Sequence, residues 1–306
     1  MSVTRKIIDW IPALAGITLI LIVFQYYINR KVIISPSSNS NKLKITTSFY
    51  PLTFLAESIG GYQVQVTTLT PPGAEPHDFE PSTRDVAELE NQDFILLNGG
   101  GLEGYEEKIR ANINIKKTQL VLVGKPLMSI PRDPHVWLDP VLYSQEAEII
   151  ASALIEKDPN HTKEYKENLK ALKKKLSDLN AEFNDKLTSC NERNIITSHT
   201  AFAYLVKRYG LQQTTLTGLS PEQEPSAKTL ADVVQFAKTK KIRYIFFEEL
   251  ASPSLADTIA REVGAQTLVL SPLEGLTKES QQAKKTYISI QKENLANLQI
   301  ALGCSQ

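Results

Sequence analysis

A long polar helix constrains this chain more than any other segment. Residues 159–188 contain no glycine, and their single proline, Pro159, is the first of them. Proline suits the first turn of a helix, so the helix is predicted to begin there. Apolar residues then recur at steps of three or four, which places them on one helical face. They are Tyr165, Leu169, Leu172, Leu176, Leu179, Phe183 and Leu187.

A helix of this length would be a rod of roughly 45 Å, longer than one small domain is wide. Its narrow apolar stripe fits a coiled-coil arm or a surface helix, or else a rigid connector between two domains. The segments on either side favour the connector, which we predict to extend over residues 159–190.

Eight short runs rich in β-branched and apolar residues flank this helix. Four precede it and four follow it, at residues 43–47, 64–69, 94–98, 119–123, 194–197, 213–217, 243–247 and 267–270. Helical patterns separate most of them, which is typical of parallel sheets covered on both faces. We therefore expect an α/β fold with two lobes, each containing a four-stranded parallel sheet and flanking helices, joined by one long rigid helix. The predicted divisions are 1–41, 42–158, 159–190 and 191–306.

The first 41 residues differ from the rest. Residues 11–29 carry no charge, and basic residues stand on both sides of them. This uncharged run is near the length that crosses a bilayer. A cleaved signal peptide usually has a shorter apolar core and a small-residue cleavage site, so we favour a signal anchor followed by a polar linker. Either alternative exports everything after residue 40.

Composition narrows the class of partner. Lysine plus arginine equals aspartate plus glutamate at 34 each, so no nucleic-acid partner is indicated. The two cysteines, Cys190 and Cys304, are far apart in sequence. In an exported protein they could pair, but two unrelated thiols fit the sequence equally well.

Three of the four histidines follow predicted strands. His77 and His135 lie in proline-rich loops after the second and fourth runs, and His199 directly follows the fifth. Glu274 follows the eighth. In open parallel sheets ligands bind beyond the carboxyl ends of the strands. Each histidine alone would more often be an ordinary loop or core residue, but three imidazoles and a carboxylate together complete a tetrahedral Zn²⁺ site.

The fourth histidine, His161, falls on the polar connector and is interpreted as a solvated surface residue. The sequence contains no His-Glu-x-x-His helix and no Gly-x-Ser-x-Gly elbow, so neither of these catalytic motifs is present.

The loops around the three histidines, with residues 218–226, 246–249 and 270–276, resemble those of the zinc- and manganese-binding solute receptors of bacterial ABC importers. The similarity covers essentially residues 42–303 in one colinear order. It implies two lobes bridged by a long helix, with a metal ion held between them by His77 and His135 from the first lobe and His199 from the second. Manganese-type members carry Glu at the position of His199, so the resemblance favours the zinc-type subgroup.

The chain departs from the family pattern in three respects. Many members use an Asp at the position of Ser271 as the last ligand, whereas Glu274 matches the Glu of another zinc subgroup. Gly275 is expected to let this loop turn Glu274 inward. Residues 124–134 contain no histidine-rich insertion, and no cysteine follows the N-terminal apolar run, so a lipid anchor is not expected.

Further side chains could support the ligands. Candidate carboxylates for holding a histidine in place are Asp78, Asp133, Asp139, Glu222, Glu224, Glu248 and Glu249, although most are expected to be helix caps or exposed charges. Asp139 in particular could cap the helix that follows it. Candidate aromatic walls of the cleft are Phe79, Trp137, Phe202 and Tyr204, for which core packing is an equal explanation.

We predict a high-affinity zinc receptor, not an enzyme, that holds Zn²⁺ as cargo through His77, His135, His199 and Glu274 and delivers it to an ABC permease. It is expected to act outside the cytoplasmic membrane as a monomer. The alternatives are an exported zinc hydrolase, a manganese receptor and an adhesin. Four protein ligands argue against the hydrolase, because catalytic zinc keeps a position open for water.

Overall fold

The computed structural model describes residues 42–221 and 223–305, which belong to one compact unit. The predicted signal anchor at 11–29 and Glu222 lie outside these residues. Among the residues that are described, no helix is long and apolar enough to cross a membrane.

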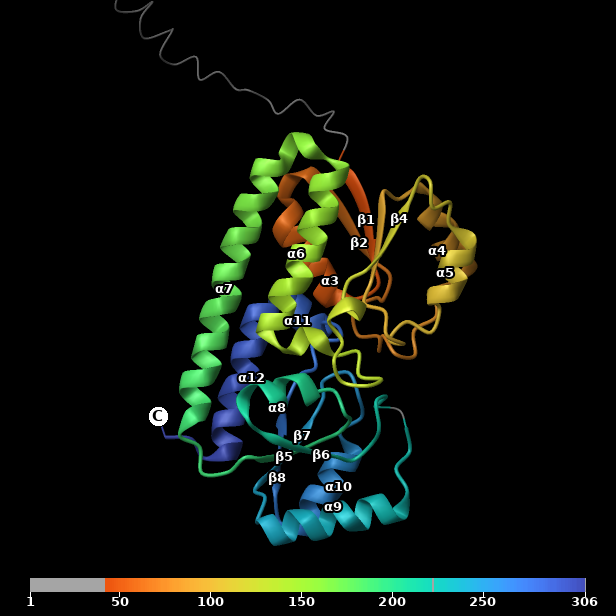
Figure 1. The fold of residues 1–306 in the computed structure, drawn as a ribbon. Coiled ribbons are helices and arrows are strands. Elements are labelled where there is room, and N and C mark those ends of the chain that lie inside the picture. The colour runs from red at the N-terminus through yellow and green to blue at the C-terminus, as the bar shows by residue number, and fades with distance from the viewer. Residues whose placement is uncertain (1–41, 222, 306) are drawn as a thin grey trace, which may run out of the picture. The chain divides into compact units, whose positions relative to one another are not determined.

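The first half of the chain forms a four-stranded parallel sheet (Figure 1). Its strands are β1 (Leu43–Thr47), β2 (Val64–Thr68), β3 (Phe94–Leu97) and β4 (Gln119–Leu122), in the order β2-β1-β3-β4. β1 pairs with both neighbours in parallel register, so that Ile45 lies opposite Val66 on one side and Phe94 on the other. The four runs predicted before the connector therefore form one sheet, with ends that differ by no more than one residue from the prediction.

Both faces of this sheet are covered, as the apolar runs predicted. Ile45 and Phe94 pack with α3 (Tyr50–Gly60) in the main core, whereas Ile95 and Leu97 pack on the other face around α5 (Glu106–Asn112). The alternation follows from the period of two in a strand. The remaining elements here are α4 (Thr83–Glu88) and the short 3₁₀ turns η1 (Gly61–Gln63), η2 (Leu89–Asn91), η3 (Lys125–Leu127) and η4 (Val136–Leu138).

The second half contains the other four expected strands. They are β5 (Asn194–Thr197), β6 (Gln212–Thr215), β7 (Tyr244–Phe247) and β8 (Gln266–Val269). They form two parallel pairs, β5-β6 and β7-β8, and β5 lies next to β7. The second sheet thus differs in detail from the continuous one expected.

Two backbone groups of the adjacent strands β5 and β7 bond to side chains. Glu192 accepts a hydrogen bond from the backbone N–H of Asn194 at 2.8 Å. The Ser198 hydroxyl donates to the carbonyl of Phe246 at 3.4 Å. Backbone groups bonded in this way do not need a partner strand. The helices of this half are α8 (Ala203–Tyr209), α9 (Ala227–Lys240), α10 (Ser254–Val263), α11 (Lys278–Gln282) and α12 (Tyr287–Leu302).

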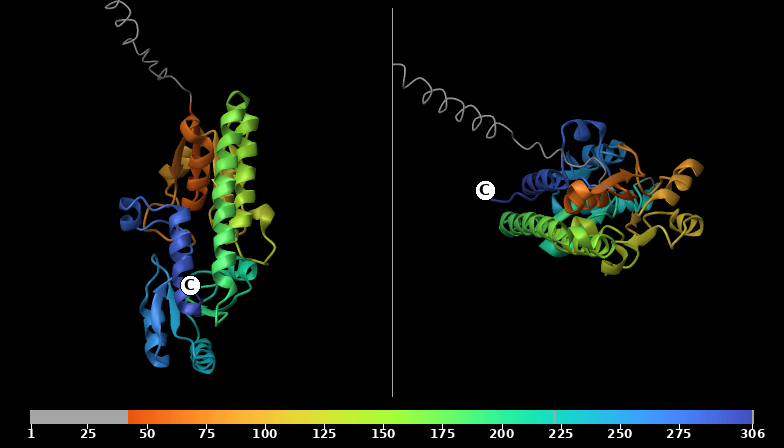
Figure 2. Two further views of the ribbon diagram at one scale, coloured as in Figure 1. Left: turned by 90° about the vertical axis from the view of Figure 1, so that its left-hand side faces the viewer. Right: turned by 90° about the horizontal axis from the view of Figure 1, so that it is seen from above.

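The connector is α7 (Thr162–Thr188), a helix of 27 residues preceded by the 3₁₀ turn η5 (Pro159–His161). It packs against α6 (Pro140–Lys157) and α3 from the first half and against α12 and α8 from the second (Figure 2). Six of the seven residues in its predicted stripe are buried, and Leu169 packs against the same core. This helix therefore joins both halves and is not a free arm.

Two further contacts connect segments that are distant in sequence. Cys190, just after α7, forms a disulfide with Cys304, just after α12. Asp139 accepts a hydrogen bond from the N–H of Val141 at 2.9 Å and so caps α6, as predicted. The same carboxylate pairs with Arg208 of α8 at 2.7 Å, which ties the first half to the second.

Candidate metal centre

Four side chains predicted from strand ends meet in one cluster. His77 lies in the loop after β2, His135 just before η4, His199 just after β5, and Glu274 after β8. Their candidate ligand atoms all lie within 4.8 Å of one another. His135, His199 and Glu274 are buried, and His77 is partly exposed, so His77 is the most accessible of the four.

The three imidazoles present the same nitrogen to the carboxylate. Glu274 Oε1 lies 3.3 Å from the Nε2 of His77, 3.0 Å from that of His135 and 3.4 Å from that of His199. Neither oxygen of Glu274, nor Nε2 of His199, has a hydrogen-bond partner among the described residues. Buried acceptors are seldom left unpaired unless a cation or water satisfies them. Three imidazole nitrogens and one carboxylate oxygen are a donor set that suits Zn²⁺.

Two carboxylates hold the buried histidines in place. Asp133 Oδ1 lies 2.7 Å from His135 Nδ1 and accepts from the backbone N–H of His135 at 2.9 Å. Glu248 Oε1 lies 2.7 Å from His199 Nδ1 and 3.2 Å from its backbone nitrogen. A carboxylate at Nδ1 keeps the proton there and leaves the Nε2 lone pair for a metal.

The other candidate carboxylates lie elsewhere. Asp78, Glu224 and Glu249 are exposed, and Asp139 caps α6. The expectation that most of this group would be caps or surface charges is therefore confirmed for these four.

The loop that carries Glu274 is held by hydrogen bonds around Ser271. Asn294 accepts from the N–H of Ser271 and donates to its carbonyl, both at 2.8 Å. The Ser271 hydroxyl accepts from the N–H of Leu273 at 3.3 Å. Ser271 thus shapes the loop and stands outside the cluster of four.

The prediction that Gly275 provides the turn is wrong. Leu273, and not Gly275, has the left-handed backbone, with φ of 59°. At Gly275 the constraint is space, because a Cβ there would lie 3.1 Å from Leu250 Cδ1 and 3.4 Å from the carbonyl oxygen of Ala74.

Burial and charge shift the protonation of the cluster in opposite directions. For Glu274, burial opposes ionisation, but the charge of His199 and the contacts with the imidazoles hold its pKa well below the usual value. For His199, burial lowers the pKa, but the nearby Glu274 and Glu248 raise it to about 10. The pKa of His135 is also raised, since Asp133 and Glu274 outweigh its burial. The cluster accordingly favours positive charge at its centre.

Glu75 is a carboxylate near the cluster that is absent from the candidates predicted from the sequence. Glu75, two residues before His77, accepts from the backbone N–H of His77 at 3.2 Å. Burial, and then repulsion from Glu274, raises its pKa to about 9. Its position in the same proline-rich loop was the available signal.

The four aromatic candidates divide between the site and the core. Trp137 is buried, with its ring centroid 5.1 Å from that of His135. Phe202 is buried in the main core, and Phe79 packs edge-on against Tyr105. The Tyr204 hydroxyl accepts from the backbone of Ser129 and Ile130 in the loop that leads to His135. Only Trp137 contacts a histidine of the cluster in this way.

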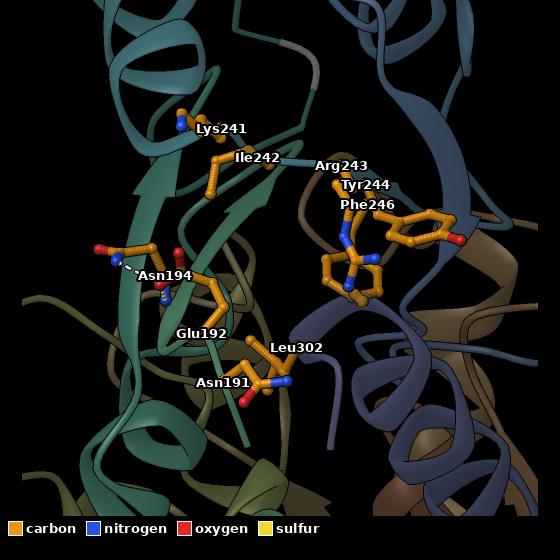
Figure 3. A pocket seen from close by; sticks show the side chains of 10 residues that line it. Asn191, Glu192, Asn194, Lys241, Ile242, Arg243, Tyr244, Phe246 and Leu302 are labelled. Carbon is orange, nitrogen blue, oxygen red and sulfur yellow. Dashed lines mark hydrogen bonds between the residues drawn. The ribbon is translucent and has the colours of Figure 1, made fainter. Parts of the chain in front are cut away.

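A cavity of about 350 Å³ lies elsewhere, at the amino-terminal ends of β5 and β7 (Figure 3). Its lining includes Glu192, Asn194 and Arg243 but no member of the histidine cluster. The amino-terminal and carboxyl-terminal ends of parallel strands lie at opposite edges of a sheet. This cavity is therefore separate from the candidate metal centre, whose residues follow the carboxyl ends.

Two α/β lobes bridged by a long helix, with candidate metal ligands gathered from the strand ends of both, define a solute-binding protein of the metal-receptor class. Residues 45–301 match the family described as ZnuA, zinc-uptake complex component A, periplasmic. The chain belongs to this family.

Two similar proteins carry names that refer to zinc. The high-affinity zinc uptake system protein ZnuA of Bacillus subtilis (strain 168) is 36% identical over 287 residues, which cover 88% of this chain and 90% of that protein. The zinc-binding lipoprotein AdcA of Streptococcus pneumoniae (strain ATCC BAA-255 / R6) is 34% identical over 276 residues, which cover 84% of this chain but only 55% of AdcA.

Solved structures share the fold as well. The Zn(II)-bound ZnuA-like domain of S. pneumoniae AdcA is 35% identical, with a TM-score of 0.78 over 86% of this chain and 99% of that domain. The metal-dependent lipoprotein YcdH of B. subtilis is 38% identical, with a TM-score of 0.77 over 85% of this chain and all of that structure.

Proposed function

We propose that this protein captures Zn²⁺ between its two lobes and delivers it to an ABC permease. His77, His135, His199 and Glu274 are the proposed ligands. The observation that carries the proposal is the convergence of three Nε2 atoms on one oxygen of Glu274, at 3.0 to 3.4 Å. Nitrogen donors favour Zn²⁺ over Mn²⁺, which prefers oxygen.

The ligand set favours a receptor over a hydrolase. Catalytic zinc usually has three protein ligands and an open position for water. Here four protein side chains would fill a tetrahedron, and three of them are buried. A filled tetrahedron argues against catalysis but would also fit a structural ion, and membership of the zinc-uptake family favours cargo.

The location of the receptor is part of the proposal. We infer that residues 42–158, 159–190 and 191–306 form two lobes and a connector outside the cytoplasmic membrane, acting as a monomer. Residues 11–29 would tether them. Mass spectrometry of the N-terminus of the purified protein tests the tether, since a mature chain that begins near Asn41 would mean that the segment is cleaved.

Growth under zinc limitation tests the function. A strain that lacks this gene should stop growing at chelator concentrations that the parent tolerates, and added Zn²⁺ should restore it more effectively than Mn²⁺. The wild-type gene should complement the strain, and the His135→Ala variant should not. Full complementation by His135→Ala would contradict the proposal.

A further inference from the structure

The indole of Trp137 joins the ligand loops of the two lobes. Its Nε1–H donates to the carbonyl oxygen of Pro272 at 2.8 Å. Trp137 comes two residues after His135, and Pro272 comes two residues before Glu274. The bond therefore links a histidine loop of the first lobe directly to the glutamate loop of the second.

Trp137 is itself held on several sides. It is fully buried, and its ring packs edge-on against Phe49 with centroids 4.7 Å apart. Its carbonyl accepts from the hydroxyl of Tyr287, in α12, at 2.6 Å. Gln291 Nε2 in turn donates to that hydroxyl at 3.2 Å. These contacts fix the indole, so its single N–H donor points in a defined direction. Removing that N–H would leave the Pro272 carbonyl without its hydrogen bond from Trp137.

The loop that receives this bond is strained. Leu273, between Pro272 and Glu274, has a positive φ, which is unfavourable for a residue with a branched side chain. Such a backbone persists only when its surroundings impose it. A second bond between the lobes lies on the other side of Glu274, where the N–H of Gly73 donates to the carbonyl of Leu276 at 2.9 Å. Contacts from the first lobe thus bracket Glu274.

We propose that Trp137 is a positioning residue that holds Glu274 against the histidines of the first lobe before zinc binds and slows its release afterwards. This inference rests on the proposed zinc-binding function. A site that is only partly populated in its competent form binds with an affinity reduced by that fraction. Without the indole donor, the glutamate loop would leave the first lobe more often, and a bound ion would lose its fourth ligand more often.

The test compares two variants of the full-length protein. Trp137→Phe removes the donor together with some ring volume. Phe49→Leu removes ring volume at the same place but no hydrogen bond. Zn²⁺ affinity is measured by competition with a chromophoric chelator, release by the rate of zinc loss to excess chelator, and folding by the melting temperature of the metal-free form.

Trp137→Phe should bind Zn²⁺ about five- to tenfold more weakly and release it faster by a similar factor, as expected for one hydrogen bond. Phe49→Leu loosens the packing around the indole but keeps its donor, so its affinity and release rate should change clearly less than those of Trp137→Phe, even where it melts at a lower temperature. The inference is overturned if Trp137→Phe binds as tightly as wild type, or if Phe49→Leu loses as much affinity for the same loss of melting temperature.

A third variant covers the case in which Trp137→Phe does not fold. Tyr287→Phe removes only the hydroxyl that donates to the Trp137 carbonyl. Zinc release from this variant should be faster than from wild type, but by a smaller factor than that expected for Trp137→Phe. Release at the wild-type rate would then overturn the inference. If the wild-type protein itself fails to bind Zn²⁺, the proposed function is wrong; if it binds and none of these variants differs from it, only the role of Trp137 is wrong.

Discussion

The Nε2 atoms of His77 and His135 lie 3.2 Å apart, although the two histidines are 58 positions apart in the chain. Asp133 accepts at Nδ1 of His135 and so directs its Nε2 lone pair toward this contact. The Nε2 atoms of both histidines also lie within 3.3 Å of Glu274 Oε1. A cation would satisfy these three electron-pair donors together.

Each histidine of the cluster should be needed for binding. Changing His77, His135 or His199 to Ala should weaken Zn²⁺ binding by about a hundredfold or more, because each removes a proposed ligand. His161→Ala should bind like wild type, since His161 pairs with Asp158 at the start of the connector. Isothermal or competition titration measures all four. Equal losses for all four would mean that the site is misassigned.

Glu274, and not Ser271, should complete the site. Glu274→Ala removes the single negative charge among the proposed ligands, so affinity should fall severely. Ser271→Ala removes only the hydroxyl that accepts from the Leu273 N–H, and the two bonds from Asn294 remain. Its loss should be small. Titration of the two variants side by side gives the answer, and a large loss for Ser271→Ala with near-normal binding by Glu274→Ala would reverse the assignment.

The carboxylate behind His199 should matter although it is not a proposed ligand. Glu248→Gln keeps the shape but weakens the hold on His199 Nδ1, and zinc affinity should fall about 10- to 100-fold. The adjacent Glu249→Gln is the matched control, because Glu249 is exposed. Competition titration compares them. Similar affinities for the two variants would show that Glu248 does not orient His199.

A buried acid away from the site should make stability depend on pH. Glu146 in α6 is fully buried, neither of its oxygens has a hydrogen-bond partner among the described residues, and burial raises its pKa well above the usual value. The unfolded chain ionises this group above its ordinary pKa while the folded chain keeps it neutral, so its contribution to stability is lost as pH rises.

Glu146→Gln should therefore stabilise the metal-free protein increasingly between pH 5 and pH 8, by up to about 1.4 kcal/mol per pH unit. Denaturant unfolding in the presence of a chelator measures this. Glu156→Gln, at an exposed position of the same helix, is the control and should show no such trend. A pH-independent difference between Glu146→Gln and wild type would contradict the burial argument.

Much of the fold and of the cluster could be predicted from the sequence because both depend on local patterns. The stripe from Tyr165 to Leu187 has one helical period, and each of the eight apolar runs is a short segment bounded by turns or helical patterns. The carboxyl ends of parallel strands meet at one edge of a sheet, so the positions of His77, His135, His199 and Glu274 after predicted strands indicate a common site.

The remainder depends on contacts between distant segments. The sequence does not distinguish among the seven candidate carboxylates, because all are acidic residues close to the ligands in the chain or in neighbouring loops. Only the folded structure shows that Asp133 and Glu248 lie at the imidazoles. The left-handed backbone at Leu273 is imposed by Ser271, Asn294 and the neighbouring loops, so local preference pointed to Gly275 instead. The pairing of Cys190 with Cys304 likewise requires that the ends of α7 and α12 lie together.

Metal content and selectivity test the central claim most directly. The purified protein, stripped of metal and dialysed against trace metals, should retain one Zn²⁺ per chain by elemental analysis. In a competition titration, Zn²⁺ should displace Mn²⁺ completely, since three imidazoles and one carboxylate favour zinc. Preferential retention of Mn²⁺, or tight zinc binding that survives the combined loss of His77, His135 and His199, would contradict the account.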